Sequence, residues 1–587
     1  MVPRSASFRY PGNDARSGKV FCDWREQMPR VSHYWVKLTA ILAVFALIVP
    51  VLTAGTAAQE GGKVLRVHHV TYPDVVDPQK SSFTNEIDIL AQAYEGLTRL
   101  DTNQQTVPAA AESWEYNDDA TQITFHLREG LKYSDGSPLT AENFRYAVER
   151  TCDPVTAGEY QSILFEIVGC AEFAGLSTDE AGEPREYTPE EYDEARSALG
   201  AKALDDRTLQ INLTNPAPYY HTIAYTWVFY PVKKEMVDKD PDNWWKTPEN
   251  HIGNGPFKIT GIDEDQRWAF EANDNYWQGR PKLDGIEYVY IEDGAVALEA
   301  YRAGDLDIAD LEPQQAAEVL EDPELSEQFV SWPTASTYSM EFNLVQEPFT
   351  DKKVREAFAY AFDRQTLCEV IRSGDCTPTL SWVPQGVPGA IETEKYAFDP
   401  EKAKQALAES SYGGPENLPE ITISYNSDVT GRGEQVEWVA GQYRDILGVE
   451  LTIEPTDGTT LTAMRKDPKT HPQIVYWAGW IQDYPDPQNW LSVYYTCGSS
   501  FAERVSYCNE DFDALVKKGD TTIDPDERLT YYEQAGEILV DDVPAVFIGN
   551  LTQQFVVNPA VTGYTPIASD VEWPGSYASQ WTIDKTE

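Results

Sequence analysis

The sequence predicts an α/β protein that folds into several lobes. Its 587 residues exceed the length that one hydrophobic core ordinarily supports and indicate about three or four lobes. Segments of alternating apolar residues, such as 63–70, are followed by segments with helical spacing, such as 85–94. The hydrophobic fraction of 41% and the aromatic fraction of 12% are typical of a globular protein and argue against a disordered chain.

Residues 1–58 are predicted to be an N-terminal extension with a targeting segment. A basic cluster precedes the apolar run 38–52, and a row of small residues follows it. This order is typical of a secretory signal peptide, cleaved here after Ala58. Met28 is an alternative start, and an uncleaved segment would act as an N-terminal membrane anchor, although the run is short for a membrane span. No cysteine follows the run to accept a lipid, so we expect export to the periplasm or the cell surface.

The charge of the chain excludes two classes of partner. The chain has 46 basic and 96 acidic residues, of which 7 basic and 3 acidic residues lie in 1–58. The exported part therefore has 39 basic and 93 acidic residues and a net charge of −54. Such a surface repels nucleic acids and anionic lipids, so we expect neither as a partner. Solubility in a saline or hot habitat is the simplest explanation of the acidity, and attraction of cationic ligands is the alternative.

Six of the seven cysteines lie in the exported part, as three pairs of near neighbours. Six cysteines allow 15 disulfide connectivities, and we predict the local one because an oxidising compartment lets close cysteines pair. A zinc site is disfavoured because the cysteines lack a Cys-x-x-Cys spacing and a nearby histidine, so no metal is expected. The predicted disulfides are Cys152 with Cys170, Cys368 with Cys376, and Cys497 with Cys508.

An aromatic stretch with two carboxylates, residues 476–490, is the strongest candidate site. A short apolar strand opens it, and the prolines of the segment 484–487 then force a turn. A carboxylate such as Asp483, held at a strand end between aromatic faces, suits a cationic group through charge and stacking. The alternative is a surface turn in which the aspartates cap a following helix and the tryptophans belong to the core.

The sequence lacks the common catalytic motifs. Gly-x-Ser-x-Gly, His-Glu-x-x-His, a phosphate-binding loop and an EF-hand loop are all missing. The carboxylates are too numerous for a catalytic pair to be chosen, and seven histidines leave little for metal or haem ligation. We therefore assign no catalytic residue, no enzymatic activity and no cofactor.

The run 108–144 carries the clearest family signature. It predicts two alternating strands, then a turn, then a helix that Thr140 caps, with Asn143 at the third helical position. Its motifs A-E-S-W, F-x-L-R-x-G and D-G-x-P-L-T-A-E-x-F resemble those of family 5 extracellular solute-binding proteins, the oligopeptide- and dipeptide-binding components of ABC importers. A G-x-G-P-F strand entry at 253–257 and a strand–helix pair over 338–364 resemble the same family. The resemblance spans nearly all of residues 61–587.

The resemblance implies a two-lobed periplasmic-binding-protein fold of the α/β class, with an extra domain on the first lobe and a hinged cleft between the lobes. By analogy, domain I comprises residues 59–107, 226–335 and 550–587, domain II, the extra domain, comprises 108–225, and domain III comprises 336–549. Within domain II, residues 173–203 depart from the family and are predicted to be an acidic helical surface insertion.

The resemblance also implies a function and a ligand site. Family members that bind peptides pair an aspartate of a G-W-x-x-D segment with the α-ammonium group, and residues 479–483 match that segment. We thus expect Asp483 to bind the ammonium group and Trp480 to form a pocket wall. A monomeric, exported protein would then capture peptides and deliver them to ABC permease subunits without covalent chemistry. The further candidate ligand-binding residues are Tyr484, Trp477, Tyr338 and Asn343.

Other ligands and roles remain open at this point. A sugar oligomer, a metal chelate or haem would suit the same fold, and an exported enzyme or a ligand-sensing partner of a membrane receptor is the alternative class. Family members restricted to dipeptides carry an arginine near the strand that matches 421–426, and this chain has none there. Arg432 is the nearest substitute, but we predict that it is a solvent-exposed loop residue.

Overall fold

The computed structural model describes residues 62–178, 184–576 and 578–584, which belong to a compact unit that spans residues 59–587. The predicted signal segment, its cleavage point and the alternative start lie outside the described residues. No helix among the described residues has the length and apolar character of a membrane span.

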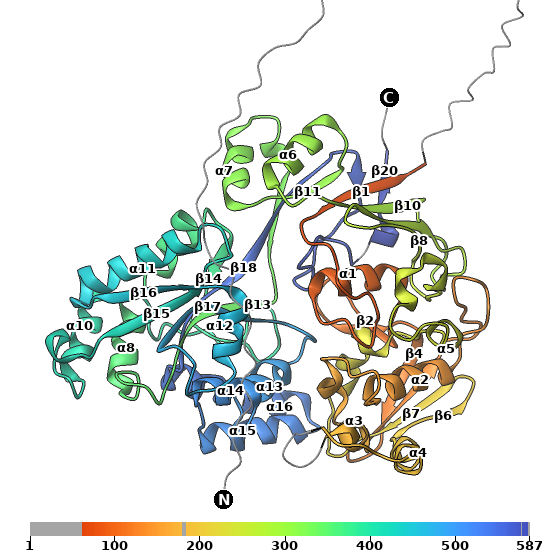
Figure 1. Cartoon of the computed structure of the whole chain (residues 1–587), viewed down its shortest axis with the longest axis horizontal. Coiled ribbons are helices and arrows are strands. Elements are labelled where there is room, and N and C mark those ends of the chain that lie inside the picture. The colour runs from red at the N-terminus through yellow and green to blue at the C-terminus, as the bar shows by residue number, and fades with distance from the viewer. Residues whose placement is uncertain (1–61, 179–183, 577, 585–587) are drawn as a thin grey trace, which may run out of the picture. The chain divides into compact units, whose positions relative to one another are not determined.

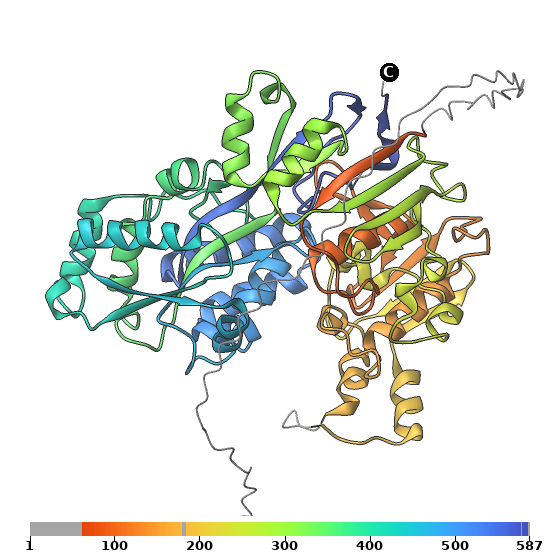
Figure 2. The same ribbon diagram turned by 45° about the horizontal axis from the view of Figure 1, so that its top comes forward.

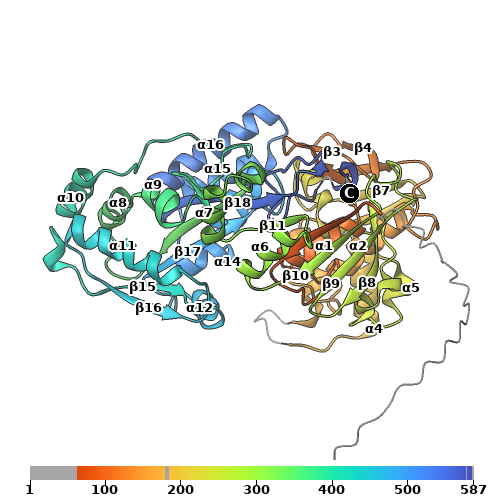
Figure 3. The same ribbon diagram turned by 90° about the horizontal axis from the view of Figure 1, so that it is seen from above.

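Twelve strands of the described residues form the main sheet, and ten of them follow one another in the order β16-β15-β17-β13-β18-β11-β1-β10-β9-β8. Figure 3 shows the second half of this order, from β18 to β8, from above. The strands are β1 (Val64–His69), β8 (Phe257–Asp263), β9 (Arg267–Ala272), β10 (Gly285–Tyr290), β11 (Ile308–Asp310), β12 (Phe329–Pro333), β13 (Ser336–Phe342), β14 (Cys376–Pro378), β15 (Ile421–Asn426), β16 (Leu451–Thr456), β17 (Ile474–Ile481) and β18 (Ala545–Val557).

The long strand β18 joins two halves of this sheet (Figure 1). Its first residues pair antiparallel with β13, so that Glu341 lies opposite Ala545. Its last residues pair with β11 and β12, so that Asp310 lies opposite Phe555. Strand β18 therefore carries the chain from one half to the other, and the short link between β12 and β13 also crosses between them, as expected of two hinged lobes.

Two large hydrophobic cores lie on either side of that connection. One is built from buried residues between 65 and 332 and again between 555 and 583. The other is built from buried residues between 335 and 548. Tyr484 is the exception, because it belongs to the first core although its chain neighbours contribute to the second.

The helices cover these sheets and their loops. Those of the first half are α1 (Thr84–Ala93), α2 (Ala141–Cys152), α3 (Cys170–Ala174), α4 (Pro189–Ala198), α5 (Lys234–Val237), α6 (Gly294–Ala303) and α7 (Pro313–Glu321). Those of the second half are α8 (Lys352–Tyr360), α9 (Arg364–Thr366), α10 (Pro400–Glu409), α11 (Arg432–Leu447), α12 (Gly458–Arg465), α13 (Val493–Tyr495), α14 (Ser500–Val505), α15 (Glu510–Thr521) and α16 (Pro525–Asp542).

Three small antiparallel sheets complete the described residues. They comprise β2 (Thr98–Leu100) with β3 (Thr106–Pro108), β19 (Val561–Thr562) with β20 (Thr582–Ile583), and a four-stranded sheet of β4 (Ala111–Tyr116), β5 (Gln122–Leu127), β7 (Thr208–Asn212) and β6 (Ala201–Asp205). Helix α2 packs on the four-stranded sheet and begins as predicted, because Asn143 Oδ1 accepts a 2.8 Å hydrogen bond from the backbone N–H of the N-cap Thr140.

A buried ion pair fixes α2 against the N-terminal segment. Arg150 donates two hydrogen bonds, of 2.5 and 2.6 Å, to the carboxylate of Asp77, and one of 2.8 Å to Gln79. Burial alone would raise the pKa of Asp77, but the guanidinium group outweighs it and the pKa is lowered. The Trp244 indole N–H donates a further 2.9 Å bond to Asp77. This network holds the four-stranded sheet in a fixed position.

The predicted helical insertion over 173–203 contains α4, a helix without buried residues that begins with a Thr188 capping box. Helices α3 and α4 contact one another and are drawn in gold in Figure 2. Residues 179–183 of the insertion lie outside the described residues.

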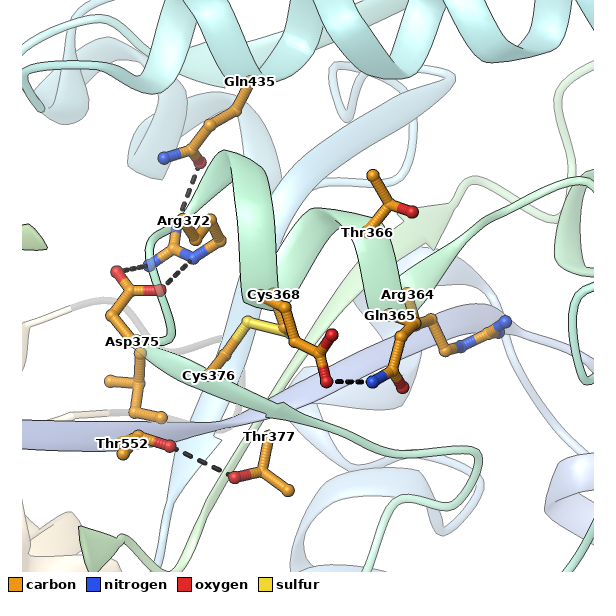
Figure 4. Close-up of a disulfide and its surroundings, with 12 residues drawn as sticks. Arg364, Gln365, Thr366, Cys368, Arg372, Asp375, Cys376, Thr377, Gln435 and Thr552 are labelled. Atoms are coloured by element: carbon orange, nitrogen blue, oxygen red, sulfur yellow. Dashed lines mark hydrogen bonds and ion pairs between the residues drawn. A yellow bond between two sulfur atoms is a disulfide. The ribbon is translucent and has the colours of Figure 1, made fainter. Parts of the chain in front are cut away.

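The three predicted disulfides are confirmed: Cys152–Cys170, Cys368–Cys376 and Cys497–Cys508 are bonded. The second one ties the π-helical turn η8 (Leu367–Ile371) to β14 (Figure 4). That turn ends next to Arg372, so the disulfide holds the position of this arginine.

Candidate ligand-binding cavity

A cavity of about 540 Å³ is lined by both halves of the fold. The first half contributes residues of α1, the segment around Tyr160 and the segment 225–230. The second half contributes Tyr338 of β13 and the end of β17. The loop 567–576 closes one side. A cavity of this size between two halves of a fold is the usual setting of a small-molecule site.

Strand β17 delivers the predicted site residues into the cavity wall. Gly479, Trp480 and Asp483 all line it. Gly479 permits close contact with β13, because a Cβ atom there would lie 2.6 Å from Cδ1 of Tyr338. Trp480 is held in place by a 3.1 Å hydrogen bond from its indole N–H to Asn489 Oδ1. The carboxylate and its neighbouring indole are therefore both fixed before any ligand binds.

Asp483 is held by groups from both halves of the fold. Asn489 donates a 3.0 Å hydrogen bond to its carboxylate and accepts one of the same length from its backbone N–H. Tyr225 donates a 2.6 Å bond to its backbone carbonyl. Among the described residues, no basic side chain forms an ion pair with this carboxylate. Burial raises the pKa of Asp483 to about 6, against the hydrogen bonds from Asn489 and Tyr160 that lower it.

Of two further predicted site residues, one lines the cavity and the other packs behind it. Tyr338 lines the cavity, and its ring stacks on Trp477 with centroids 5.0 Å apart. Trp477 itself does not line the cavity. Trp477 occupies a β-bulge between β17 and β13, and its backbone φ of 65° is one that residues other than glycine rarely adopt. The bulge turns the Trp477 ring toward two arginines.

Those two arginines form a cluster with Trp477. The Arg372 guanidinium lies 3.6 Å from the Trp477 ring centroid, and that of Arg432 lies 5.1 Å from it. Arg372 donates 2.6 and 2.7 Å hydrogen bonds to Asp375 and a 2.8 Å bond to Gln435 (Figure 4). Its charge is thus balanced by Asp375.

The prediction that Arg432 is a solvent-exposed loop residue is wrong. It is the first residue of α11 and is partly buried, because the helix places it against the aromatic rings of β17. Burial, with the neighbouring Arg372, lowers its pKa to about 10. Its Nη1 atom is buried without a hydrogen-bond partner, and within the described ranges it forms no ion pair with a carboxylate. The cluster therefore carries one uncompensated positive charge.

The remaining two predicted site residues do not line the cavity. Tyr484 is 2% exposed, and its hydroxyl donates a hydrogen bond to Gln488. Asn343 is fully buried and donates bonds of 2.8 and 3.0 Å to the backbone carbonyls of Pro468 and His471. Asn343 thus holds the loop 468–471, and Tyr484 belongs to the core of the first half.

Several residues of the cavity were not identified from the sequence. Tyr160 and Tyr225 reach Asp483 from segments far away in the chain, and only the folded structure brings them there. Asp88 and Glu572 line the same cavity. Of the missed residues, Ile481, Gln482 and Asn489 had a sequence signal, since they lie in the stretch 476–490 that was singled out. In the part of the chain that the structure describes, no group of three or more His, Cys, Asp or Glu side chains is arranged to hold a metal ion.

Comparison with known proteins identifies the family. Residues 105–502 match the profile described as "Bacterial extracellular solute-binding proteins, family 5 Middle". The chain belongs to the family 5 extracellular solute-binding proteins. This match confirms the predicted membership, and the family is one of solute-binding proteins.

Relatives of this solute-binding protein match over nearly their whole length. The periplasmic oligopeptide-binding protein OppA of Haemophilus influenzae is 29% identical, over 89% of this chain and 93% of the relative. The dipeptide-binding protein DppE of Bacillus subtilis is 27% identical, over 88% and 92%. The crystal structure of Haemophilus influenzae OppA in complex with RPPGFSPFR has a TM-score of 0.69 and 27% identity, over 89% of this chain and 99% of that one. The predicted two-lobed α/β fold is confirmed.

Proposed function

We propose that the protein binds short peptides between its two lobes and delivers them to the permease of an ABC importer. The observation that carries the proposal is Asp483, a carboxylate without a basic partner among the described residues, fixed beside Trp480 in a cavity that both halves line. This environment suits a peptide α-ammonium group, which brings the missing positive charge and several hydrogen-bond donors. The peptide-binding relatives support the same function.

The division into domains is part of this proposal. Lobe I comprises residues 59–107, 226–335 and 550–587, the extra domain 108–225, and lobe II 336–549. The two separate hydrophobic cores support two lobes that move as units. A ligand that contacts both lobes stabilises the closed form, which the permease would then recognise. We further propose that the protein acts as an exported monomer, in the periplasm or at the cell surface, and catalyses no reaction.

The opposite end of the peptide is assigned to the arginine cluster. Trp477 and Asp483 are six residues apart along β17 and the turn after it, which limits their separation to about 20 Å and matches a peptide of roughly four to six residues. Arg432 has a buried N–H group without a partner, as a carboxylate site requires. The Trp477 ring connects this arginine to the cavity wall at Tyr338.

This assignment predicts a dependence on the C-terminal carboxylate. A tetra- or pentapeptide with a free carboxylate is expected to bind about tenfold more tightly than its C-terminal amide, because the amide leaves Arg432 uncompensated. Isothermal titration measures both affinities. In Arg432→Gln the difference should shrink, whereas in Arg444→Gln, which changes an exposed arginine of the same helix, it should persist. Equal affinities of acid and amide in the native protein would contradict the assignment.

Peptide affinity is expected to depend on pH through Asp483. Its pKa of about 6 in the ligand-free protein means that the carboxyl group is neutral below pH 6 and cannot pair with an ammonium group. Affinity should therefore fall by up to about tenfold per pH unit below 6, and fall again above about pH 8 as the peptide amine loses its proton. Titrations between pH 4.5 and 9 test this. The same affinity at pH 5 and pH 7 would be inconsistent with a titrating carboxylate at the site.

The proposed function as a whole is tested by a thermal-shift screen of the purified protein. Tri- to pentapeptides are expected to raise the melting temperature, because a ligand bound only by the folded state stabilises it. Sugar oligomers serve as the comparison. Stabilisation by sugars alone, with no effect of any peptide, would refute a peptide-binding role.

A further inference from the structure

The cavity that Asp483 lines contains further acidic residues. Five carboxylate residues line the cavity, and among the described lining residues Arg99 is the one with a basic side chain. Glu95 lies near Arg99 and balances its charge. The Glu95 carboxylate also accepts hydrogen bonds from Tyr276 and Trp277. We call the three that remain besides Asp483 and Glu95 the acidic wall: Asp88, Asp570 and Glu572.

The acidic wall has no counter-charge of its own. Asp88 accepts hydrogen bonds of 2.8 and 3.0 Å from the Trp573 indole N–H, and Asp570 accepts them from the backbone of Ile567 and Ser576. These donors are all neutral, and no Lys or Arg of the described residues forms an ion pair with Asp88, Asp570 or Glu572. Burial, and then the charges of Glu572 and Asp570, raise the pKa of Asp88. The carboxyl groups thus destabilise one another's charged forms.

A buried histidine points into the same place. His69 is 4% exposed, and its Nε2 atom lies 3.8 Å from Oδ2 of Asp88 without a hydrogen-bond partner. Burial lowers the pKa of His69 to about 3, so the ring is neutral and supplies no positive charge. The buried His69 nitrogen lacks a hydrogen-bond partner, and the carboxylates beside it lack a counter-charge. This arrangement indicates that a polar group of a ligand completes the site.

The surrounding surface suits a cation with a hydrocarbon stem. The Phe83 ring lines the cavity and is 61% exposed, whereas Trp573 is 1% exposed and presents its indole N–H to Asp88. Aromatic faces attract ammonium and guanidinium groups, and they also cover the methylene groups of a long side chain. A neutral or acidic side chain would leave the carboxylates uncompensated.

We propose that the acidic wall is a subsite for the basic side chain of a lysine or arginine in the bound peptide, so that the protein selects cationic peptides. This inference rests on the proposed peptide-binding function and adds a specificity to it. Asp483 takes the α-ammonium group, and Asp88 with Glu572 takes a second positive charge.

The test compares side chains of nearly equal length that differ in charge. Pentapeptides with lysine at the first, second or third position and alanine elsewhere are titrated against the same peptides with norleucine. At one position at least, the lysine peptide is expected to bind ten times or more tightly, because a charge-assisted hydrogen bond in a buried site exceeds the 1.4 kcal/mol that corresponds to tenfold. Equal affinities at all three positions, or tighter binding of norleucine, would overturn the inference.

Two variants locate the effect. Glu572→Gln is expected to reduce the ratio of lysine to norleucine affinity by fivefold or more, since Glu572 is partly exposed and its replacement keeps the side-chain shape. Glu264→Gln, which removes one charge from an exposed turn, should leave the ratio as it is. A lysine preference that persists undiminished in Glu572→Gln would overturn the assignment to the acidic wall. Binding of no peptide at all would instead overturn the proposed function, and the two failures are thus distinguishable.

Discussion

Asp483→Asn is expected to lower peptide affinity by about 100-fold, the largest functional effect of any single change at the site. The substitution keeps the shape of the side chain but removes the charge that would pair with the α-ammonium group. Loss of one partner of a buried charge pair costs about 2–5 kcal/mol, and 100-fold corresponds to about 2.7 kcal/mol. Isothermal titration of the native protein and the variant with one tetrapeptide measures the ratio.

An N-acetylated peptide provides the matched control on the ligand side. It lacks the ammonium group, so it should bind weakly to the native protein and equally weakly to Asp483→Asn. The variant should fold normally. Burial raises the pKa of Asp483 in the folded protein to about 6. Protonation of this carboxyl group therefore stabilises the folded state at low pH, and that stabilisation is lost as the pH rises through 6. At pH 7.5 the substitution should leave the free energy of unfolding of the ligand-free protein equal or higher. Undiminished affinity in this variant would remove Asp483 from the site.

Arg150→Leu is expected to lower the free energy of unfolding by about 3–5 kcal/mol, the largest effect on stability. The Arg150 side chain is 5% exposed, and its removal leaves the fully buried Asp77 carboxylate without a counter-charge. Chemical denaturation followed by tryptophan fluorescence measures the difference. Helix α2, which this pair fixes, packs on the four-stranded sheet.

Arg145→Leu is the matched control on the same helix. Arg145 pairs with Glu142 and Glu149, but its partners are partly exposed, and surface pairs contribute about 0–1 kcal/mol. The contrast between the two variants therefore measures burial rather than loss of an arginine from α2. If the two variants lowered the free energy of unfolding by the same amount, to within about 1 kcal/mol, the account of the Asp77 pair would be contradicted.

The sequence predicted those parts of the fold that depend on neighbours in the chain. The first strand, the Thr140 cap and the three disulfides depend on spacings of a few to eighteen residues, and all appear in the structure. Asp351 caps α8 in the same local way, through a hydrogen bond from the backbone N–H of Lys353. Such features are fixed by hydrogen-bonding and covalent geometry over short distances.

The cavity depends on contacts that no local pattern records. The stretch around Trp480 and Asp483 was recognisable because its aromatic and acidic residues are close together in the chain. Tyr160 and Tyr225 were not, since each is an ordinary tyrosine until the fold brings it to Asp483. Arg432 was misjudged because the glycines on either side suggested a loop, whereas Gly431, with a φ of 76°, forms the N-cap of α11.

The acidic wall was hidden for a different reason. Asp88 lies on α1, and Glu572 lies near the end of the described chain, so nearly five hundred residues separate them. Because the chain has 96 acidic residues, an aspartate or glutamate at a given position does not by itself indicate a binding site. The structure shows that both line one cavity with neutral hydrogen-bond donors around them.

A crystal structure of the protein with a bound tetra- or pentapeptide tests the central claim most directly. We expect the α-ammonium nitrogen within about 3 Å of the Asp483 carboxylate, in a cavity closed by both lobes. An Asp483 carboxylate that faces bulk solvent, or a peptide whose amino end lies elsewhere, would contradict it.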